Sequence, residues 1–403
     1  MNLAENHEGN QLAIACAGGI PAIVAAMNSH GTNYKVQQKG CEALECLSRD
    51  HECNQRAIAC AGGIPAIVAA MNSHGTNYMV QEYAFGALMN LARNHEGNQL
   101  AIACAGGIPA IVAAMNSHTT NPEVQQNGCE ALLNLSRNHE GNQLEIITVD
   151  GITTIVDTMN MHKTNKAVQH NGCEILWTVI SKHSTNNASL PGFSSYSSAI
   201  GIVMKRNEAD HEVQQVCCGA LMNWARIKFS YKKDVYSYDF IEAIQDAMML
   251  HNTDVVIQQH GCAAIMYLAE NHKDRPATDA CAGCINSIVD AMNSQTNNPK
   301  VLQYGCRALM SLARNHEGSQ GCIASAGGIP AIVAAMNSHT TISDVQQYAC
   351  GALMNLAWNH EGNQLAIACA GGIPAIVAAM NSHGTNYMVQ EFSCEAQIGR
   401  AHV

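Results

Sequence analysis

Histidines form two series at regular spacing along the chain. Because imidazole is a common metal ligand, such series could bind a metal ion. One column holds His30, His74, His118, His339 and His383, and the other holds His7, His95, His139, His316 and His360. Members of a column stand one repeat apart, a distance of roughly 10 Å if helices pack between them. Metal–ligand bonds of about 2 Å cannot span that distance. We therefore expect no metal site and assign both columns to interactions at helix C-termini.

Cysteine, which could form disulfides, bind zinc or act as a nucleophile, also recurs by position. One column holds Cys16, Cys60, Cys104 and Cys369, and another holds Cys41, Cys129, Cys173, Cys306 and Cys350. The C-x-x-C motif from Cys281 to Cys284 has no second pair at zinc-finger spacing. We interpret the cysteines as small core residues of an intracellular protein.

Catalytic motifs are missing from the sequence. No nucleophile elbow, phosphate-binding loop, paired acid motif or H-E-x-x-H occurs. The Gly-Gly pairs have no strand before them, so they are not nucleotide loops. The sequence therefore predicts a protein that is not an enzyme and needs no cofactor and no small-molecule substrate.

A repeat of 44 residues positions all these columns. Gly18-Gly19, Gly62-Gly63 and Gly106-Gly107 stand 44 residues apart, as do Gly327-Gly328 and Gly371-Gly372. Val-Gln or a similar pair keeps the same step from Val36 to Val389, with one step of 45. A fixed period of this size is typical of a helical solenoid.

Three helices are expected in each unit. In the first full unit, Asn10 would cap a short helix over 11–17, and Gly18-Gly19 would end it. A second helix begins near Pro21, where a missing N–H is tolerated. A third, longer helix runs from about 35 to 49, and its apolar positions recur at helical spacing.

The order of these motifs resembles the armadillo repeat. Residues 121–156 carry Asn-x-x-Val-Gln, Ala-Leu-x-Asn-Leu and Asn-Gln-x-x-Ile in that order, and other copies add Gly-Gly-Ile-Pro. HEAT repeats are the nearest rival, but they are usually two-helix units without this hinge. The resemblance implies an all-α fold, a right-handed α-solenoid of about nine armadillo-type three-helix repeats.

The array is expected to occupy the whole chain, 1–403, as one domain. The repeats are placed at approximately 10–53, 54–97, 98–141, 142–185, 186–230 (degenerate), 231–274, 275–318, 319–362 and 363–396 (truncated). The degenerate region lacks Gly-Gly, and Ser194–Ser198 and Lys228–Tyr238 are expected to form altered loops or a distorted first helix. Residues 397–403 resemble translated sequencing-adapter read-through, so we interpret them as a non-native tail. Both ends then lie inside a repeat.

The resemblance also indicates a binding site, because armadillo third helices line a concave groove that holds extended peptides. Importin-like members use an Asn there to clamp the peptide backbone, since an amide both donates and accepts. That role carries over to Asn90, Asn134, Asn223 and Asn355, whose stripe we expect to face outward. Importins also place a Trp four residues earlier, and this chain has Glu or another residue there. The chain is therefore predicted not to be of the importin-alpha peptide-binding type.

Charged and aromatic residues share the same stripe. Glu42, Glu130 and Glu174 could hold a basic ligand, whereas Arg93 and Arg137 favour a groove of mixed charge. Tyr267 and Trp358 interrupt the asparagines with aromatic rings, which either form binding hot spots or are partly buried against a neighbouring repeat.

Charge and hydropathy limit the classes of partner that the chain is expected to bind. The net charge of −11 and the absence of a basic stripe argue against nucleic acid and suit a basic protein segment. The apolar run 100–115 is shorter than the roughly 20 residues of a membrane span, and Gly106-Gly107 interrupts it. No transmembrane segment is therefore expected.

The predicted function is a protein–protein interaction scaffold or adaptor in the cytoplasm, with the nucleus as a further location. Two alternatives stay open. The array could be the regulatory arm of a larger kinase or ubiquitin ligase, or a structural component of a cytoskeletal or ciliary assembly. An appended catalytic domain would select the first.

Overall fold

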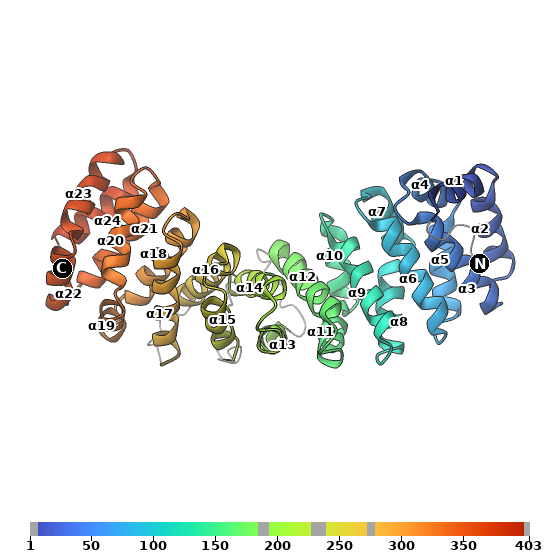
Figure 1. Cartoon of the computed structure of the whole chain (residues 1–403), viewed down its shortest axis with the longest axis horizontal. Helices are drawn as coiled ribbons and strands as arrows, with labels where there is room; N and C mark the ends of the chain where they lie inside the picture. The colour runs from blue at the N-terminus through green and yellow to red at the C-terminus, as the bar shows by residue number, and fades with distance from the viewer. Residues whose placement is uncertain (1–6, 184–192, 227–238, 272–278, 399–403) are drawn as a thin grey trace. The chain divides into compact units, whose positions relative to one another are not determined.

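The computed structural model describes residues 7–183, 193–226, 239–271 and 279–398, which form 24 helices and no strand. Two compact units divide the chain, residues 1–199 and 200–403. Within each unit the helices follow one another in the repeating order expected from the sequence (Figure 1). The all-α solenoid class is confirmed, and its handedness stays a prediction.

Each helix has one of three places in the repeat. The first helices are α1 (Glu8–Cys16), α4 (Glu52–Cys60), α7 (Glu96–Cys104), α10 (Glu140–Thr148), α19 (Glu317–Ser325) and α22 (Glu361–Cys369). The second helices are α2 (Gly19–Ser29), α5 (Gly63–Ser73), α8 (Gly107–Ser117), α11 (Gly151–Met161), α13 (Phe193–Arg206), α15 (Asp239–Leu250), α17 (Asp279–Ser294), α20 (Gly328–Ser338) and α23 (Gly372–Ser382). The third helices are α3 (Tyr34–Ser48), α6 (Tyr78–Ala92), α9 (Pro122–Ser136), α12 (Lys166–His183), α14 (His211–Arg226), α16 (Val255–Asn271), α18 (Pro299–Ala313), α21 (Ser343–Ala357) and α24 (Tyr387–Ile398).

The first helices begin at a histidine cap rather than at the predicted asparagine. Nδ1 of His7 accepts the backbone N–H of Asn10 at 3.2 Å, so α1 starts three residues before the predicted position. Asn54, the counterpart of Asn10 in the next repeat, is buried inside α4, where Nδ2 donates to the carbonyl of Leu47 at 3.0 Å. The prediction of Asn10 as the cap was therefore wrong.

The Gly-Gly pair forms the hinge between the first and second helices, as predicted. Gly106 has a φ of +77°, in the left-handed region that disfavours residues with a Cβ, and α7 and α8 meet at 70°. The next glycine serves close packing, because a Cβ on Gly107 would lie 2.5 Å from Cγ2 of Ile102 and 2.9 Å from its carbonyl oxygen. The second glycine is thus required by close packing, whereas the left-handed place of the first is also taken by Asp150, with a φ of +59°, between α10 and α11.

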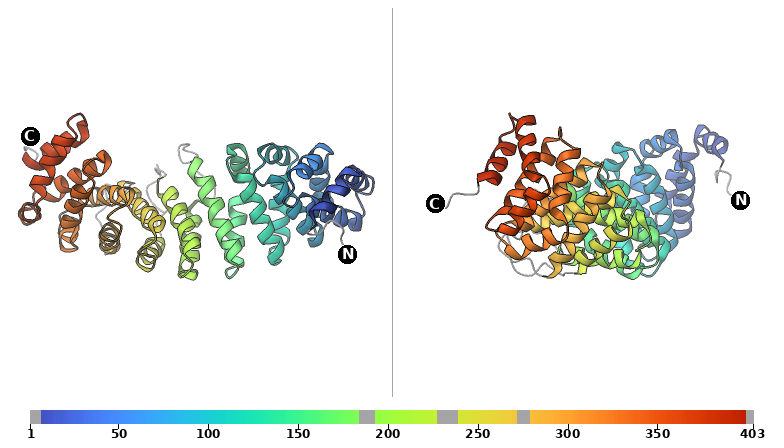
Figure 2. Two further views of the ribbon diagram at one scale, coloured as in Figure 1. Left: turned by 45° about the horizontal axis from the view of Figure 1, so that its top comes forward. Right: turned by 60° about the vertical axis from the view of Figure 1, so that its left-hand side comes forward.

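The third helices carry the core of both units. Asn33 caps α3 through its side chain, and Pro122 stands in the first turn of α9, where no N–H is needed. In the first unit α3, α6, α9 and α12 pack each on the next (Figure 2). In the second unit α14, α16, α18, α21 and α24 do the same. A row of side chains on consecutive third helices therefore forms one continuous face in each unit.

The degenerate region keeps more helix than the sequence indicated. Ser194–Ser198 lies within α13, not in an altered loop. Lys228–Tyr238 lies outside the described residues, as do residues 399–403 of the expected non-native tail.

Candidate functional site

Glutamines hold every described third helix except α18, which has Leu302 at this position, against the second helix of its own repeat. In the Val-Gln pair of α9, Nε2 of Gln125 donates to the carbonyls of Met115 and His118 at 2.7 and 3.0 Å. The same bonds recur at Gln37, Gln81, Gln169, Gln214, Gln258, Gln346 and Gln390. They satisfy carbonyls at the end of the second helix, which otherwise have no partner within it. The Val-Gln motif thus orients the third-helix face.

The two histidine columns have different structural roles. His30, His74, His118, His339 and His383 occupy the C-cap of a second helix, as predicted. The other column, His7, His95, His139, His316 and His360, caps the N-terminus of a first helix, with Nδ1 accepting a backbone N–H at 2.9–3.2 Å. The prediction of helix C-terminal interactions was therefore wrong for that second column. Among the described residues, no group of three or more potential ligands could hold a metal ion.

Asn90 and Asn355 join neighbouring repeats rather than facing outward freely. Nδ2 of Asn90 donates to the carbonyl of Glu45 at 3.2 Å, and Nδ2 of Asn355 donates to the carbonyl of Met310 at 2.8 Å. Each acceptor lies on the preceding third helix. The outward orientation expected for Asn90 was wrong, because its side of α6 packs against α3 and leaves it only 6% exposed.

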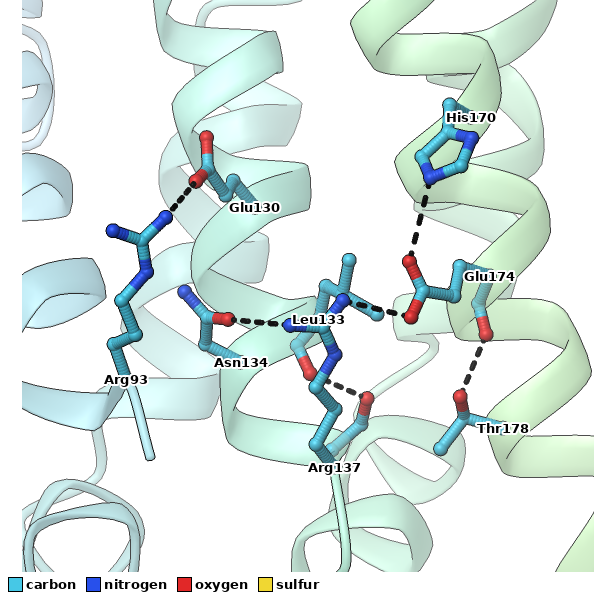
Figure 3. A network of polar contacts seen from close by, with 9 residues as sticks. Arg93, Glu130, Leu133, Asn134, Arg137, His170, Glu174 and Thr178 are labelled. Carbon is cyan, nitrogen blue, oxygen red and sulfur yellow. Dashed lines mark hydrogen bonds and ion pairs between the residues drawn. The ribbon is translucent and has the colours of Figure 1, made fainter. Parts of the chain in front are cut away.

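Asn134 and Asn223 are also buried, at 4% and 2% exposure, so the outward orientation expected for them was wrong as well. Their amide nitrogens are not used in the same way as that of Asn90. Neither Nδ2 atom has a hydrogen-bond partner, although both are enclosed. Oδ1 of Asn134 accepts weakly from Arg137 at 3.4 Å, and Asn134 lies between Arg93 and Arg137 in Figure 3. A buried donor without a partner costs about 1–3 kcal/mol, so these two amides can gain from a carbonyl that reaches them.

Arginine and glutamate alternate between consecutive repeats of the first unit. Arg137 lies 2.7 Å from Oε1 of Glu174, and Arg93 lies 4.0 Å from Glu130 (Figure 3). Arg93 also lies 3.7 Å from Asp50. A hydrogen bond from His170, together with the contact with Arg137, lowers the pKa of Glu174. The sequence predicted mixed charge at these positions, and the structure adds that the opposite charges pair across the repeats. Glu42 is paired within its own helix, with Lys39 at 2.6 Å.

In the second unit the same pair of positions has its charges exchanged. Glu270 stands at the position that Arg93 and Arg137 have in the first unit, and Arg307 stands at the position of the glutamates there. The guanidinium of Arg307 donates two hydrogen bonds to Glu270, at 2.6 and 3.0 Å. The guanidinium of Arg307 also lies 5.1 Å from the centre of the Tyr348 ring, within the range of a cation–π contact. Sequence reasoning missed Glu270 and Tyr348, although aligning the repeats at Val301 and Val345 would have shown Tyr304 and Tyr348 at one position.

Tyr267 and Trp358 are both half-buried, between the two interpretations that the sequence left open. Burial is the largest cause that raises the pKa of Tyr267, and Tyr304 and Arg307 also act on that phenol. The backbone carbonyl of Trp358, at the C-cap of α21, accepts from Gln320 at 3.2 Å. Tyr267, Tyr304, Arg307 and Tyr348 therefore form a mixed aromatic and charged cluster on α16, α18 and α21.

The cysteine columns separate by burial. Cys41, Cys129, Cys173, Cys306 and Cys350 are buried, as expected of core residues. Desolvation raises the pKa of Cys129 to about 12, so its thiol is unreactive at neutral pH. The other column, Cys16, Cys60, Cys104 and Cys369, is exposed at the end of the first helices, so the core interpretation was wrong for it.

No single helix among the described residues is long and apolar enough to cross a membrane. Five pairs joined at a Gly-Gly hinge reach that length and apolarity only when both helices are counted together, and each pair is bent by 70–72°.

Comparison with known proteins gives one family and several similar structures. Residues 63–235 and 228–398 match the family model described as "LRRK2 ARM repeat". An engineered protein is 25% identical with a TM-score of 0.73, and the match covers 98% of this chain and 92% of that chain. A chain from a structure on a phosphorylation switch between cadherin and beta-catenin is 17% identical, with a TM-score of 0.75 and coverage of 93% and 68%. This second likeness concerns the fold alone. No curated protein matches the sequence.

Proposed function

The chain belongs to the armadillo-repeat family described as LRRK2 ARM repeat, and we propose that it is a scaffold or adaptor holding an extended partner segment along its third helices. Armadillo solenoids bind other proteins, and one structural neighbour comes from a study of cadherin and beta-catenin. The third-helix face of this chain supports the same kind of role.

The two amide donors without partners are the observation that supports this proposal most directly. Nδ2 of Asn134 and Nδ2 of Asn223 are enclosed and make no hydrogen bond. An extended segment offers a backbone carbonyl at every residue, so it can supply the missing acceptor after a small side-chain movement. Asn90 and Asn355 already donate to the preceding repeat and would contribute only their oxygens.

The charges on the same face favour a partner of mixed character over a purely basic one. Glu130 and Glu174 each face an arginine of the preceding repeat, which reduces their attraction for a lysine ligand. In the second unit Tyr267, Arg307 and Tyr348 add half-buried rings beside a guanidinium, a combination that is enriched at binding hot spots. An aromatic or apolar partner residue suits this second cluster.

A non-enzymatic role and a cytoplasmic or nuclear location complete the proposal. Seventeen cysteines of the described residues are free thiols, as expected in a reducing compartment. The two alternative functions, a regulatory arm of a larger enzyme and a cytoskeletal or ciliary component, stay predictions.

Peptide selection followed by single substitutions tests the proposal. Peptides selected from a random display library on the immobilised chain are measured by fluorescence anisotropy against Asn134→Ala and, separately, Asn223→Ala. For each selected peptide, we expect one of the two substitutions to lower its affinity for the chain about fivefold. This factor corresponds to the loss of one hydrogen bond of roughly 1 kcal/mol.

Asn90→Ala and Asn355→Ala are the matched controls. Each removes a bond between repeats, so each should lower the unfolding free energy by roughly 0.5–1.5 kcal/mol. Their effect on peptide affinity should be smaller than that of Asn134→Ala or Asn223→Ala. Peptides that bind equally well to all four variants, or a selection that yields no binder, would discard the third-helix site.

A further inference from the structure

One repeat of the second unit presents an apolar pair where its counterparts are polar. The second helix ends in Asn-Ser in most repeats, at Asn28-Ser29, Asn72-Ser73, Asn116-Ser117, Asn293-Ser294, Asn337-Ser338 and Asn381-Ser382. At the end of α15 the corresponding residues are Met249 and Leu250, which are 68% and 54% exposed. Two adjacent exposed apolar side chains at a polar position indicate a contact surface, because neither contributes to the core.

A cleft lies between the second helices α15 and α17, next to Met249 of this pair. Its volume is about 560 Å³, within the range of ligand sites, and Met249, Asp246 and Asp290 are among the residues that line it. No lysine or arginine is among them. The cleft therefore carries one carboxylate on each flanking helix, Asp246 on α15 and Asp290 on α17, and Met249 lies on the same helix as Asp246.

Substitutions at three further positions account for this cleft. Gln245 replaces a valine that is nearly fully buried in regular repeats, as at Val112 and Val333. Ser287 replaces the buried alanine found at Ala110 and Ala331. Asp246 and Asp290 occupy one position in successive repeats, where Ala113 and Ala334 stand elsewhere. Gln245 and Ser287 thus place polar side chains where regular repeats bury valine and alanine.

Asp246 is exposed to like charges of neighbouring carboxylates. Burial, followed by the neighbouring Glu242 and then Glu208, raises the pKa of Asp246, and Lys205 opposes the shift. Lys205 itself is ion-paired with Glu242. A cation placed in the cleft would lower the free energy of the ionised Asp246, whereas an anion would raise it.

We propose that Met249, Leu250, Asp246 and Asp290 form a second docking surface, separate from the third-helix face, for a short basic amphipathic segment of a partner protein. Apolar residues of that segment lie on Met249 and Leu250, and a lysine or arginine enters the cleft between the two aspartates. Charge complementarity favours this occupant, because the cleft lining carries carboxylates and no cation. Methionine suits such a surface because its flexible side chain adapts to different apolar partners.

Variants built from the chain's own repeats test this proposal with little risk of unfolding. Met249→Asn with Leu250→Ser restores the pair found in six other repeats, and Asp246→Ala with Asp290→Ala restores the alanine of regular repeats. The probe is a synthetic helical peptide with lysines on one face and leucines on the other. We expect each double variant to weaken binding of this peptide about tenfold, measured by fluorescence anisotropy. Binding to the unchanged chain should weaken as salt is raised from about 50 to 300 mM.

Three controls separate this surface from general stickiness. A peptide with glutamate in place of lysine should not bind. Asn337→Met with Ser338→Leu places the apolar pair on α20 without the aspartates, so adding it to the Met249→Asn, Leu250→Ser variant should not restore binding. Asn134→Ala should leave binding of the lysine peptide unchanged, which keeps the two proposed sites distinguishable.

Several results would overturn the docking surface. Equal affinity of the lysine peptide for the unchanged chain and both double variants would do so. So would binding of the chain to phosphatidylserine vesicles that is lost with Met249→Asn and Leu250→Ser, since the occupant would then be a membrane. Analytical ultracentrifugation that shows these substitutions dissociating an oligomer would assign the surface to a second copy of the chain.

Discussion

The hinge between α7 and α8 and the helix α17 occupy the same place in the repeat but have opposite shapes. At the hinge, Gly106 adopts a left-handed conformation and the two helices meet at 70°. In α17, Gly283 and Cys284 take the positions of the two glycines, and the helix runs through them from Asp279 to Ser294. In α17 cysteine replaces the second glycine, and Asn286 stands where the hinge has Pro109.

The difference shows that the first glycine alone does not determine the hinge. Gly106 and Gly283 are both glycine, so freedom at the first position alone does not bend the chain. At the second position a Cβ would approach Ile102 to 2.5 Å in the hinge, whereas Cys284 carries its Cβ and is buried in the continuous helix. The second glycine together with Pro109, rather than the left-handed turn at the first glycine, therefore distinguishes the regular repeats from the repeat beside the acidic cleft.

The largest expected difference is in the unfolding free energy of two variants, Gly107→Ala and Gly283→Ala. Gly107→Ala forces the backbone of α8 away from Ile102 and should lower the unfolding free energy by about 2–3 kcal/mol, a typical cost of overpacking. Gly283→Ala meets only the end of the flexible Gln245 side chain, at 2.7 Å, and gains helix propensity. It should therefore be neutral or stabilising by up to about 1 kcal/mol. Urea unfolding of both variants measures the contrast, and equal destabilisation would remove the distinction.

A smaller effect is expected from the charge that α15 carries and regular repeats lack. The pKa of Asp246 is raised in the folded chain, so its ionised form disfavours folding and the penalty is present above the raised pKa. The penalty disappears as the pH falls through that value and the carboxyl is protonated. Asp246→Asn should therefore raise the melting temperature at pH 7, by less than the Gly107→Ala loss, and should have no effect near pH 3. A variant that melts lower than the unchanged chain at pH 7 would contradict the assignment.

The last and smallest expected difference is in the rates at which two thiols of the folded chain are alkylated. Cys104 is exposed at the end of α7, whereas Cys284 is 4% exposed in α17, with Nε2 of Gln245 3.2 Å from its sulfur. Iodoacetamide should modify Cys104 on the order of tenfold faster than Cys284 in the folded chain. Peptide mass spectrometry gives both rates, and denaturation should make them equal. Similar rates before denaturation would show that Cys284 is not packed in α17.

The sequence was sufficient for the elements that a strict period describes. The spacing of Gly106-Gly107, the position of the third helices and the all-α class follow from residue types repeated 44 apart, because each repeat makes the same local contacts. The loss of the hinge at Cys284 could also be anticipated from the sequence, because the second glycine is missing there.

The orientation of the polar residues could not be predicted in the same way. Helical spacing places Asn90 and Asn134 on one stripe but does not tell which side of α6 or α9 the neighbouring third helix covers. That depends on how consecutive repeats pack, and it decides that Asn90 donates to Glu45 while Nδ2 of Asn134 has no partner. The first-helix cap was missed for a related reason, because both Asn10 and His7 can accept a backbone N–H and only the helix start distinguishes them.

The bonds between repeats also bear on how such an array changes its length during evolution. Nε2 of His74, His118, His162, His251 and His383 lies 2.6–2.8 Å from a loop carbonyl 43 residues earlier in every case. These five junctions thus use the same atoms at the same offset, so removing or copying one whole unit between two of them joins surfaces that already fit. Unequal recombination between near-identical repeats would then yield longer and shorter arrays that fold without new mutations at the joint. The same recombination event would also change which partners bind across several consecutive repeats.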